Sequence, residues 1–160
     1  MSAEPNDAPK NSVVRTAHRD DARALCELLA TLGYPSSPAE VGRRISDCLT
    51  SSGSAVFVAE SAQRPVGLLS FHCIPLFHAD GLLGRITSLV VAPDFRQRGV
   101  GRLLVTAAEE FARARGCVKV EVTSGDHRLD AHAFYERLGY HTDCRRFIKP
   151  CSNPRSNLMP

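Results

Sequence analysis

The sequence lacks the features of an exported or membrane-bound protein. Its longest apolar stretches are far shorter than the roughly 20 residues that a membrane-spanning helix needs. Residues 1–11 are polar and have no apolar core of the kind found in a signal peptide. The 160 residues include no tryptophan, and aromatic residues make up 6% of the chain. We therefore expect a cytoplasmic protein that does not bind a membrane.

The six cysteines lack the spacing of a metal site or a disulfide framework. They lie at positions 26, 48, 73, 117, 144 and 151, and no two of them form the C-x-x-C pair that is typical of zinc and redox motifs. Four stand inside apolar periodic segments, as buried free thiols do in a reducing compartment. None has the paired histidine of a cysteine nucleophile. The pattern predicts no metal and no covalent enzyme intermediate.

Lysine is scarce, with three lysines against seventeen arginines in a chain of net charge +3. The planar guanidinium fork of arginine matches the oxygens of a phosphate. Basic runs such as Arg43-Arg44 and Arg145-Arg146 could touch nucleic acid, but no aromatic residues interleave with them and no nucleic-acid motif accompanies them. We expect no nucleic-acid partner, and only the placement of the arginines can argue for a phosphorylated ligand.

The length and composition fit one compact domain. Hydrophobic residues make up 43% of the chain and charged residues 23%, close to the average of globular proteins. A chain of this size buries roughly two-thirds of the surface that its unfolded form exposes. Both ends are rich in Pro, Ser and Asn and show little periodicity. We expect flexible tails at residues 1–11 and 149–160 around a single domain at residues 12–148.

Apolar periodicity predicts a mixed α/β fold. Alternating and β-branched segments predict strands, and apolar residues spaced three or four apart predict helices that end at glycines. Strands and helices alternate in the second half, which favours parallel pairing there, whereas the first half favours antiparallel hairpins. The expected order is strand 12–18, helices 20–32 and 38–52, strands 55–60, 66–77 and 83–92, helix 99–115, strand 118–122, helix 130–138 and strand 140–148.

The most specific segment is Leu89–Leu104, in which a strand passes through a turn with glycines and arginines into a helix. The first N–H groups of a helix have no internal partner and lie at the positive end of its dipole, so they donate to phosphate oxygens. Gly99 and Gly101 let a ligand approach the backbone closely. The alternative is a surface turn that caps a packed helix. Three arginines add positive charge to the segment: Arg96, Arg98 and Arg102.

The R-x-x-G-x-G pattern of residues 96–101 resembles the acyl-coenzyme A signature of the GCN5-related N-acetyltransferase (GNAT) family. A second segment, Asp130–Tyr140, resembles the late helix of that family, whose A-x-x-F-Y stretch runs alongside the coenzyme. The order of elements also resembles the family from about Ser12 to Ile148. The resemblance implies the acyl-CoA N-acyltransferase fold, with acetyl-CoA as cosubstrate.

By the same resemblance, the backbone N–H groups of residues 98–102 bind the pyrophosphate, and the strand before the turn borders the pantetheine arm. Many relatives carry an asparagine three residues before the alanine of the late helix. This chain has Arg128 there, an arginine that could reach a phosphate instead. The coenzyme-binding residues that the resemblance implies are Leu89, Val90, Val91, Arg96, Gln97, Arg98, Gly99, Val100, Gly101, Arg102, Leu103, Arg128 and Phe134.

The resemblance gives Tyr135 the role of the acid that protonates the departing thiolate, although Tyr135 and Phe134 could also simply pack the helix against the sheet. A backbone N–H at a strand bulge, near Val91, would polarise the thioester. Histone-type relatives have a glutamate base early in the preceding strand, where this chain has Arg85. The base is thus unassigned among several polar residues, or water relays the proton. The candidates are His72, His78, Asp80, Asp126, His127 and His132.

The acceptor pocket is expected between residues 32–38 and 72–78, with Tyr34, His72 and His78 as substrate-binding residues. The predicted reaction transfers the acetyl group to a primary amine of a small molecule or peptide by direct attack in a ternary complex. The alternative is a sensor that binds acetyl-CoA without turnover. The oligomeric state is left open, with a homodimer among the alternatives.

Overall fold

The structure is a computed structural model that describes residues 12–143 and 145–151. These residues form two compact units, the first ending at Val122 and the second beginning at Thr123. The predicted tail at residues 1–11, most of the predicted tail at 149–160 and Cys144 lie outside the described residues. Within the described part of the chain, no helix is long and apolar enough to cross a membrane.

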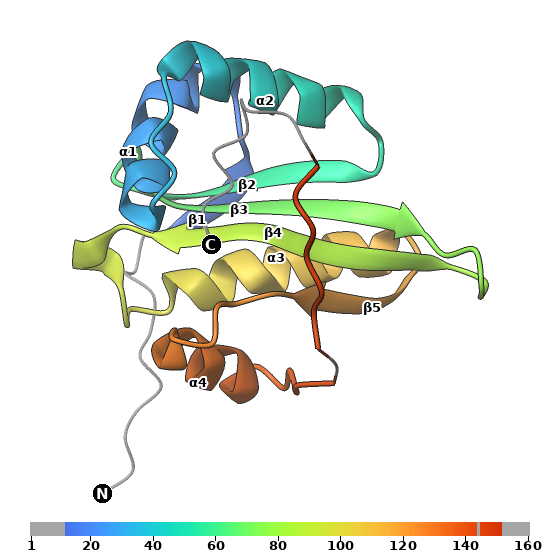
Figure 1. The fold of residues 1–160 in the computed structure, drawn as a ribbon. Helices are drawn as coiled ribbons and strands as arrows, with labels where there is room; N and C mark the ends of the chain where they lie inside the picture. Colours follow the sequence, from blue (N-terminus) through green and yellow to red (C-terminus); the bar gives the residue numbers. More distant parts are fainter. Residues whose placement is uncertain (1–11, 144, 152–160) are drawn as a thin grey trace, which may run out of the picture. The chain divides into compact units, whose positions relative to one another are not determined.

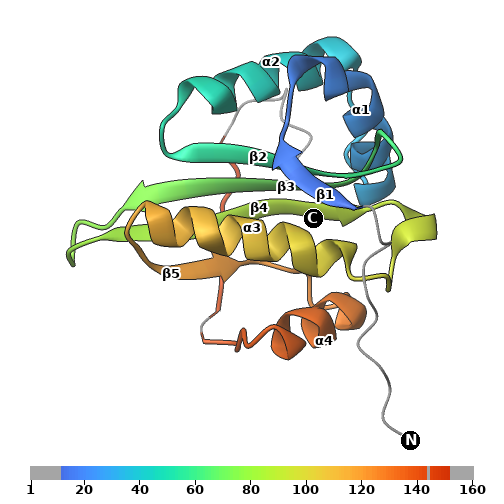
Figure 2. The same cartoon turned by 180° about the vertical axis from the view of Figure 1, so that it is seen from behind.

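The first unit is a five-stranded sheet with helices on both faces (Figures 1 and 2). Its strands are β1 (Val13–Thr16), β2 (Ser54–Ser61), β3 (Arg64–Pro75), β4 (Leu82–Val91) and β5 (Cys117–Val122). Its helices are α1 (Ala22–Leu32), α2 (Pro38–Thr50) and α3 (Val100–Ala114), with short 3-10 turns η1 (Arg19–Asp21) and η2 (Pro93–Phe95). The second unit contains α4 (Leu129–Arg137). These bounds lie close to the predicted ones.

The strands lie in the order β1-β2-β3-β4-β5. Pairs from β1 to β4 are antiparallel, and β4 pairs with β5 in parallel. The predicted mixed sheet is therefore confirmed. Helices α1 and α2 cover one face of this sheet and α3 covers the other, as Figures 1 and 2 show from opposite sides.

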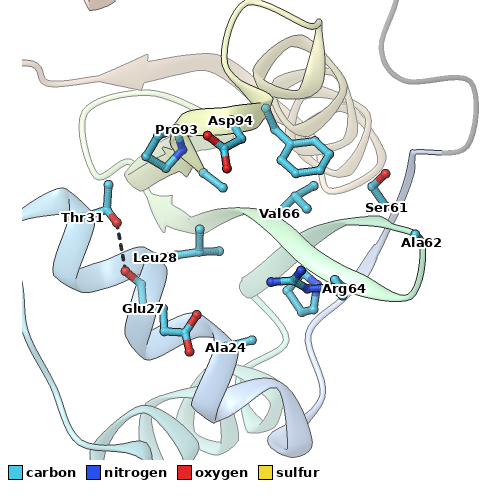
Figure 3. A pocket seen from close by; sticks show the side chains of 13 residues that line it. Ala24, Glu27, Leu28, Thr31, Ser61, Ala62, Arg64, Val66, Pro93 and Asp94 are labelled. Carbon is cyan, nitrogen blue, oxygen red and sulfur yellow. Dashed lines mark hydrogen bonds between the residues drawn. The ribbon is translucent and has the colours of Figure 1, made fainter.

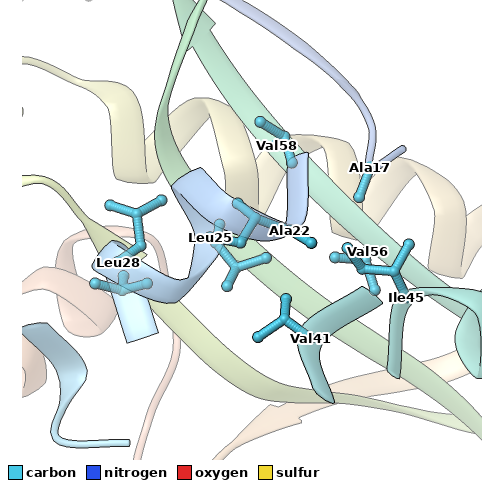
Figure 4. Close-up of a cluster of buried hydrophobic side chains, with 10 residues drawn as sticks. Ala17, Ala22, Leu25, Leu28, Val41, Ile45, Val56 and Val58 are labelled. Carbon is cyan, nitrogen blue, oxygen red and sulfur yellow. The ribbon is translucent and has the colours of Figure 1, made fainter. Parts of the chain in front are cut away.

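The α1–α2 face holds a cluster of buried aliphatic side chains (Figure 4). Leu25 and Ile45 are 1% and 2% exposed, and each such side chain contributes about 1.5–3 kcal/mol by leaving water. Leu49 follows Val41 and Ile45 of α2 at the same spacing of four residues, but it is exposed. The cluster consists of Ala17, Ala22, Leu25, Leu28, Val41, Ile45, Val56, Val58, Leu68 and Val90.

The opposite face of the sheet is packed against α3 by aromatic contacts. The ring of Phe111 lies 5.9 Å from the rings of both Phe57 and Phe71, in edge-to-face geometry. Such pairs add roughly 0.5–1.5 kcal/mol to the burial of the rings. Because Phe57 alternates with Val56 and Val58 of the aliphatic cluster, β2 serves both cores.

Strand β4 contains one extra residue. Its pairing with β3 matches Ser88 to Ser70 but Ile86 to Phe71, so Thr87 has no partner and forms a β-bulge. The Oγ1 atom of Thr87 lies 2.7 Å from Oγ of Ser70. A bulge reverses the alternation of side chains along a strand. The residues of β4 before Thr87 and those after it therefore alternate between the two faces of the sheet in opposite order.

The cysteines of the described residues are free thiols. Cys26, Cys48, Cys73 and Cys117 are half-buried and Cys151 is exposed, so the four thiols predicted in apolar segments are only partly shielded. Sγ of Cys117 lies 3.5 Å from Sγ of Cys73. Burial, together with this contact, raises the pKa of Cys117 to about 11, which keeps the thiol protonated at neutral pH.

The predicted last strand over residues 140–148 is wrong. None of the described residues in that segment belongs to a strand. Its sequence lacks the alternation that gives a strand one apolar face, because Tyr140 is followed by a polar run. Phe147 and Ile148 are adjacent in sequence and are 92% and 72% exposed, so neither secures a core face.

The first strand is tied to the first helix by a buried carboxylate. Both terminal nitrogens of Arg15 donate to the carboxylate of Asp21 at 2.8 Å, and Nε of Arg15 donates to Glu60 at 2.7 Å. The backbone N–H of His18 also donates to Asp21, at 2.7 Å. The hydrogen bond from Arg15 is the main cause that holds the pKa of Asp21 below its ordinary value.

We predict that Asp21→Asn lowers the free energy of unfolding by about 2 kcal/mol at pH 7, because a charge-assisted hydrogen bond to a buried group is lost. Since the folded pKa of Asp21 is depressed, its stabilisation is present above the ordinary carboxyl pKa and is lost as the pH falls below it. Urea denaturation from pH 7 to pH 3 measures both effects. A variant whose stability falls with acid as steeply as that of the wild type would contradict this role.

The first turns of α3 pack closely against the backbone of Gly67 in β3. A Cβ atom at Gly67 would lie 2.9 Å from Cδ1 of Leu104 and 3.2 Å from Cγ1 of Val100. Both of these α3 side chains are buried, with 0% and 1% exposure, so neither has free space. The missing side chain thus sets how closely the start of α3 approaches the sheet.

We predict that Gly67→Ala lowers the free energy of unfolding by about 1–3 kcal/mol, through overpacking against α3. Gly42→Ala is the matched control, because its new Cβ would meet only Cβ of Ala22 at 3.8 Å, an ordinary contact. Alanine is favoured over glycine inside a helix by about 1 kcal/mol, so the control should be neutral or stabilising. Thermal denaturation of both variants checks the prediction, which fails if the two shift alike.

Candidate functional site

The turn between β4 and α3 has an unusual backbone. Gln97 has φ 58° and Gly99 has φ 78°, both in the left-handed region. Gly99 is the N-cap residue of α3, and no side chain caps the helix there. Glycine is the residue that adopts this conformation without steric cost. The sequence had singled out Gly99 for closeness to a ligand, and the backbone requires glycine as well.

A run of backbone donors is free at this turn. The N–H of Phe95 donates to O of Ala92 at 2.9 Å, and the N–H of Arg96 donates to O of Pro93 at 3.2 Å. The next hydrogen bond of the ladder is from Leu103 to Gly99, at 3.1 Å. Within residues 12–143 and 145–151, the N–H groups between these points, at residues 97–102, donate to no other protein group. They are the orphan donors of a helix N-terminus.

Cationic side chains surround these donors. The guanidinium of Arg98 lies 5.7 Å from the ring centre of Phe95, and Nε of Arg96 donates to O of Val91 at 3.2 Å. Arg96, Arg98 and Arg102 are all exposed. No carboxylate of the described chain forms an ion pair with any of them. The turn therefore presents uncompensated positive charge and free N–H groups together, an arrangement that suits a multiply charged anion.

The edge of β4 that leads to this turn is unpaired on one side. The parallel ladder joins Leu82–Ile86 to Cys117–Val122 and ends at Ile86 and Val122. No strand of the described chain pairs with residues 87–91 on that side. Leu89 and Val91 are half-buried and Val90 is buried. The backbone beyond the bulge at Thr87 thus retains free polar groups that an amide-containing ligand could pair with. The bulge lies four residues before Val91, the position near which the sequence placed it.

The predicted acceptor residues differ in their surroundings. Tyr34 is 41% exposed, and its N–H donates to O of Leu29 at 2.9 Å. His78 is exposed, whereas His72 is half-buried with Nδ1 2.9 Å from Oγ of Ser54. No contact joins Tyr34 to either histidine among the described residues. The acceptor-binding role of these three residues remains a prediction.

Arg85, the residue at the position of the histone-type base, forms an ion pair. Its Nη1 lies 3.0 Å from Oε1 of Glu121, its register partner on β5. The side chains of Arg85 and Glu121 are 29% and 36% exposed. A carboxylate therefore does lie beside this point of β4, although it comes from the neighbouring strand.

In the second unit, Tyr135 is set among aromatic rings of its own segment. Its ring centre lies 5.1 Å from that of Phe134 and 5.6 Å from that of Tyr140. Burial, opposed by the smaller effect of the Arg128 charge, raises the pKa of Tyr135 to about 12. Arg128 is the exposed N-cap residue of α4, and no side chain caps that helix. Tyr135 is therefore a protonated phenol across the neutral range.

A cavity of about 310 Å³ lies at the C-terminal end of β4, beside the segment that leads into the turn before α3 (Figure 3). The side chains of Glu27, Arg64 and Asp94 point into it. Two carboxylates beside one guanidinium do not suit a diphosphate. Its border at Ala92 lies roughly 20 Å along the strand from Arg85, given a rise of about 3.3 Å per residue. This cavity is not the acceptor pocket that the sequence predicted. Its lining consists of Ala24, Glu27, Leu28, Thr31, Ser61, Ala62, Arg64, Pro65, Val66, Ala92, Pro93, Asp94 and Phe95.

Sequence reasoning expected a bulge near Val91 but missed its position at Thr87, and it missed Ser54 as the partner of His72 and Glu121 as the partner of Arg85. A signal for the bulge existed, because Thr87 and Ser88 are two adjacent polar residues inside an apolar strand, which breaks strict alternation. Ser54 and Glu121 acquire their partners only through strand register, and a one-residue change in register would move them to the other face.

Comparison with known proteins agrees with this geometry. The model of the acetyltransferase (GNAT) family matches residues 22–140. The glucosamine 6-phosphate N-acetyltransferase of Trypanosoma brucei brucei is 33% identical over 132 residues, 79% of this chain and 87% of the relative. The aminoalkylphosphonate N-acetyltransferase of Salmonella typhimurium is 39% identical over 84 residues, 52% of this chain. The match spans 54% of that relative's length.

A solved aminoglycoside N-acetyltransferase in complex with coenzyme A is similar in fold. Its TM-score is 0.79 over 89% of this chain and 96% of that chain, at 16% sequence identity. The free donors at the start of α3, the matched family model and the long alignment with the trypanosomal relative agree with one another. The chain belongs to the acetyltransferase (GNAT) family.

Proposed function

We propose that this protein transfers the acetyl group of acetyl-CoA to a primary amine of a small molecule, by direct attack in a ternary complex. The observation that carries the proposal is the run of free N–H groups at residues 97–102, beside uncompensated arginines. Acetyl-CoA, the cosubstrate of the GNAT family, supplies an activated acyl thioester and a diphosphate. The diphosphate is the kind of anion that such a turn binds.

Residues of two neighbouring segments would hold the coenzyme. The N–H groups of residues 98–102, with Gln97 beside them, would donate to the diphosphate. Arg96, Arg98 and Arg102 would add charge. Leu89, Val90 and Val91 would border the pantetheine arm, whose amides can pair with the free edge of β4 as an added strand does. The free edge begins at the bulge, and an N–H there would donate to the thioester oxygen.

Tyr135 would return a proton to the leaving sulfur. A phenol with a pKa of about 12 is protonated at neutral pH and so is able to donate. An ordinary thiol has a pKa of about 8.5, which makes the transfer uphill in water. Burial raises the pKa of a thiol as it does that of a phenol, so the mismatch shrinks when both groups share a buried site. Arg128 and Phe134, from the same segment, would contact the coenzyme.

The names of the relatives support a small, phosphorus-containing amine as acceptor. One relative is named for an aminoalkylphosphonate and the other for glucosamine 6-phosphate. Both acceptors carry an amino group and an anionic group in one small molecule. Tyr34, His72 and His78 would line the acceptor site, and the protein would act without a nucleic-acid or membrane partner.

A second function, a sensor that binds acetyl-CoA without turnover, is favoured by one observation. Arg85 stands where histone-type relatives carry a glutamate base, so that carboxylate is missing from the strand. The two functions differ in turnover. Release of free thiol from acetyl-CoA that depends on an added amine supports the enzyme. Thermal stabilisation by acetyl-CoA, without thiol release across aminoalkylphosphonates, glucosamine 6-phosphate, aminoglycosides and peptides, supports the sensor.

We predict that Arg98→Glu weakens coenzyme A binding roughly 10- to 100-fold, because a charge-assisted contact to phosphate is replaced by repulsion. Arg43→Glu makes the same change in net charge on α2, across the sheet from α3, and should leave the affinity within about twofold. Calorimetric titration with coenzyme A measures both. Equal weakening in the two variants would show that binding responds to net charge and not to the turn.

We predict that Tyr135→Phe lowers kcat about 10²-fold without changing coenzyme A affinity, because the variant keeps the ring and loses the proton. Thiol release at saturating acetyl-CoA measures the rate, and calorimetry measures the affinity. A variant with unchanged kcat would assign Tyr135 to packing alone.

A further inference from the structure

A row of polar side chains crosses four strands of the first unit. Strand register places Ser54 of β2 opposite His72 of β3, His72 opposite Arg85 of β4, and Arg85 beside Glu121 of β5. Directly opposite residues point to the same face of a sheet and lie about 5 Å apart at Cβ. The four side chains therefore form one line across the sheet, and we name them the polar row.

The polar row lies on the α1–α2 face. Val56 and Leu68 belong to the aliphatic cluster of that face, and side chains two residues apart share a face. Ser54 lies two residues from Val56, and His72 lies four residues from Leu68, so both side chains share the face of the aliphatic cluster. Arg85 joins this face only because the bulge at Thr87 reverses the alternation of β4.

The row is open to solvent at its β4–β5 end. On this face α2 packs on β2, and α1 packs on β3 and on β4, where Val90 belongs to the cluster. Arg85 and Glu121 keep 29% and 36% of their side-chain surface exposed, whereas His72 is half-buried behind them. A ligand that reaches the bulge from this face would meet the row at its exposed end.

The imidazole of His72 is fixed by a chain of hydroxyl groups. Oγ of Ser54 donates to Oγ of Ser51 at 3.3 Å, and the same oxygen lies 2.9 Å from Nδ1 of His72. When the Ser54 hydroxyl donates to Ser51, its oxygen accepts from Nδ1 of His72, and this is the tautomer that the proposal below uses. Nε2 then bears the lone pair. Within the described residues, Nε2 makes no hydrogen bond to the protein.

We propose that His72 is the base of the acetyl transfer, taking a proton from the acceptor ammonium at Nε2, directly or through one water. This inference rests on the proposed function. The ammonium loses one proton to His72, and the free amine then attacks the thioester carbon. The new bond is C–N, and the broken bond is C–S. After the attack the nitrogen still carries two protons, and it releases one of them to water as the amide forms. On the proposed function, the thiolate takes its proton from Tyr135, and both residues are reset by exchange with water.

Burial supports this role because it lowers the pKa of His72 and keeps the imidazole neutral at pH 7. The ionisable groups that strand register places in the row with His72 are Arg85 and Glu121. Arg85 in turn is held by Glu121 at 3.0 Å.

The other candidate bases have less favourable settings. His78 and Asp80 are exposed on the segment between β3 and β4, without a fixed partner among the described residues. In the second unit, Nε2 of His132 lies 3.0 Å from O of Gly125, so that nitrogen is already engaged. His72 combines a fixed Nδ1 with a free Nε2.

His72→Gln tests the proposal, with acetyl-CoA and 2-aminoethylphosphonate, a primary alkylamine, as probes. At pH 7 the variant should lose about 10²-fold in kcat/KM for the amine. Its rate should rise about tenfold per pH unit toward pH 10, where the amine, with a pKa near 10, deprotonates without help. The wild type should be nearly flat above neutral pH, so the gap between the two should close.

Ser54→Ala and Ser54→Thr test the positioning of the imidazole. The alanine variant should lose several-fold in kcat at pH 7, and the threonine variant, which keeps the oxygen, should recover most of it. These variants also serve if His72→Gln folds poorly, which thermal denaturation and coenzyme A titration would reveal. His141→Gln, an exposed histidine of the second unit, is the control and should match the wild type.

The outcomes separate the two proposals. A wild type that turns over while His72→Gln keeps its rate at pH 7 within twofold overturns the role of His72 and leaves the proposed function standing. A constant gap between the two at all pH values also overturns it, because a structural defect would not be repaired by deprotonating the amine. A wild type without thiol release on any amine overturns the proposed function and this inference together.

Discussion

The extra residue at Thr87 is the constraint on which the site of the first unit depends. Without it, a regular β4 would turn Ile86 toward α1 and α2 and would bury Arg85 against α3, where an unpaired guanidinium is costly. The bulge also lies where the ladder with β5 ends, so the backbone that follows has a free edge. One local irregularity thus sets both where the free edge of β4 begins and the face that Arg85 shares with His72.

Strand β4 leads directly into the turn at residues 96–101, and the packing of α3 on the sheet fixes the position of that turn. Val100 and Leu104 rest on the bare backbone of Gly67, so the start of α3 is fixed against β3. A helix N-terminus binds anions only as well as its N–H groups converge. Here no side chain caps the helix at the left-handed Gly99, so the first N–H groups of α3 lack a hydrogen-bond acceptor. These N–H groups are available to a bound anion.

The sequence was sufficient for most of the fold because local patterns determined it. Alternation located β2 to β5, glycines marked the ends of α1 and α3, and the order of elements gave a mixed sheet. The Tyr140–Ile148 segment failed because apolar residues alone, without alternation, do not make a strand. The turn at residues 96–101 was visible as a motif. The polar row was not visible in the sequence, because strand register alone brings Ser54 beside His72 and Glu121 beside Arg85. Register depends on how two strands pair and not on either segment alone.

The division of the sheet into two chemically distinct faces has a consequence for how such a protein can diversify. Along β3, Gly67 seats the helix of the anion turn, whereas His72 belongs to the opposite face with Ser54 and Arg85. Residues of one strand therefore have different neighbours on the two faces of the sheet and can be substituted independently. On the proposed function, side chains on the α1–α2 face would select the amine, and they could change without altering the turn at residues 96–101 that would bind the coenzyme.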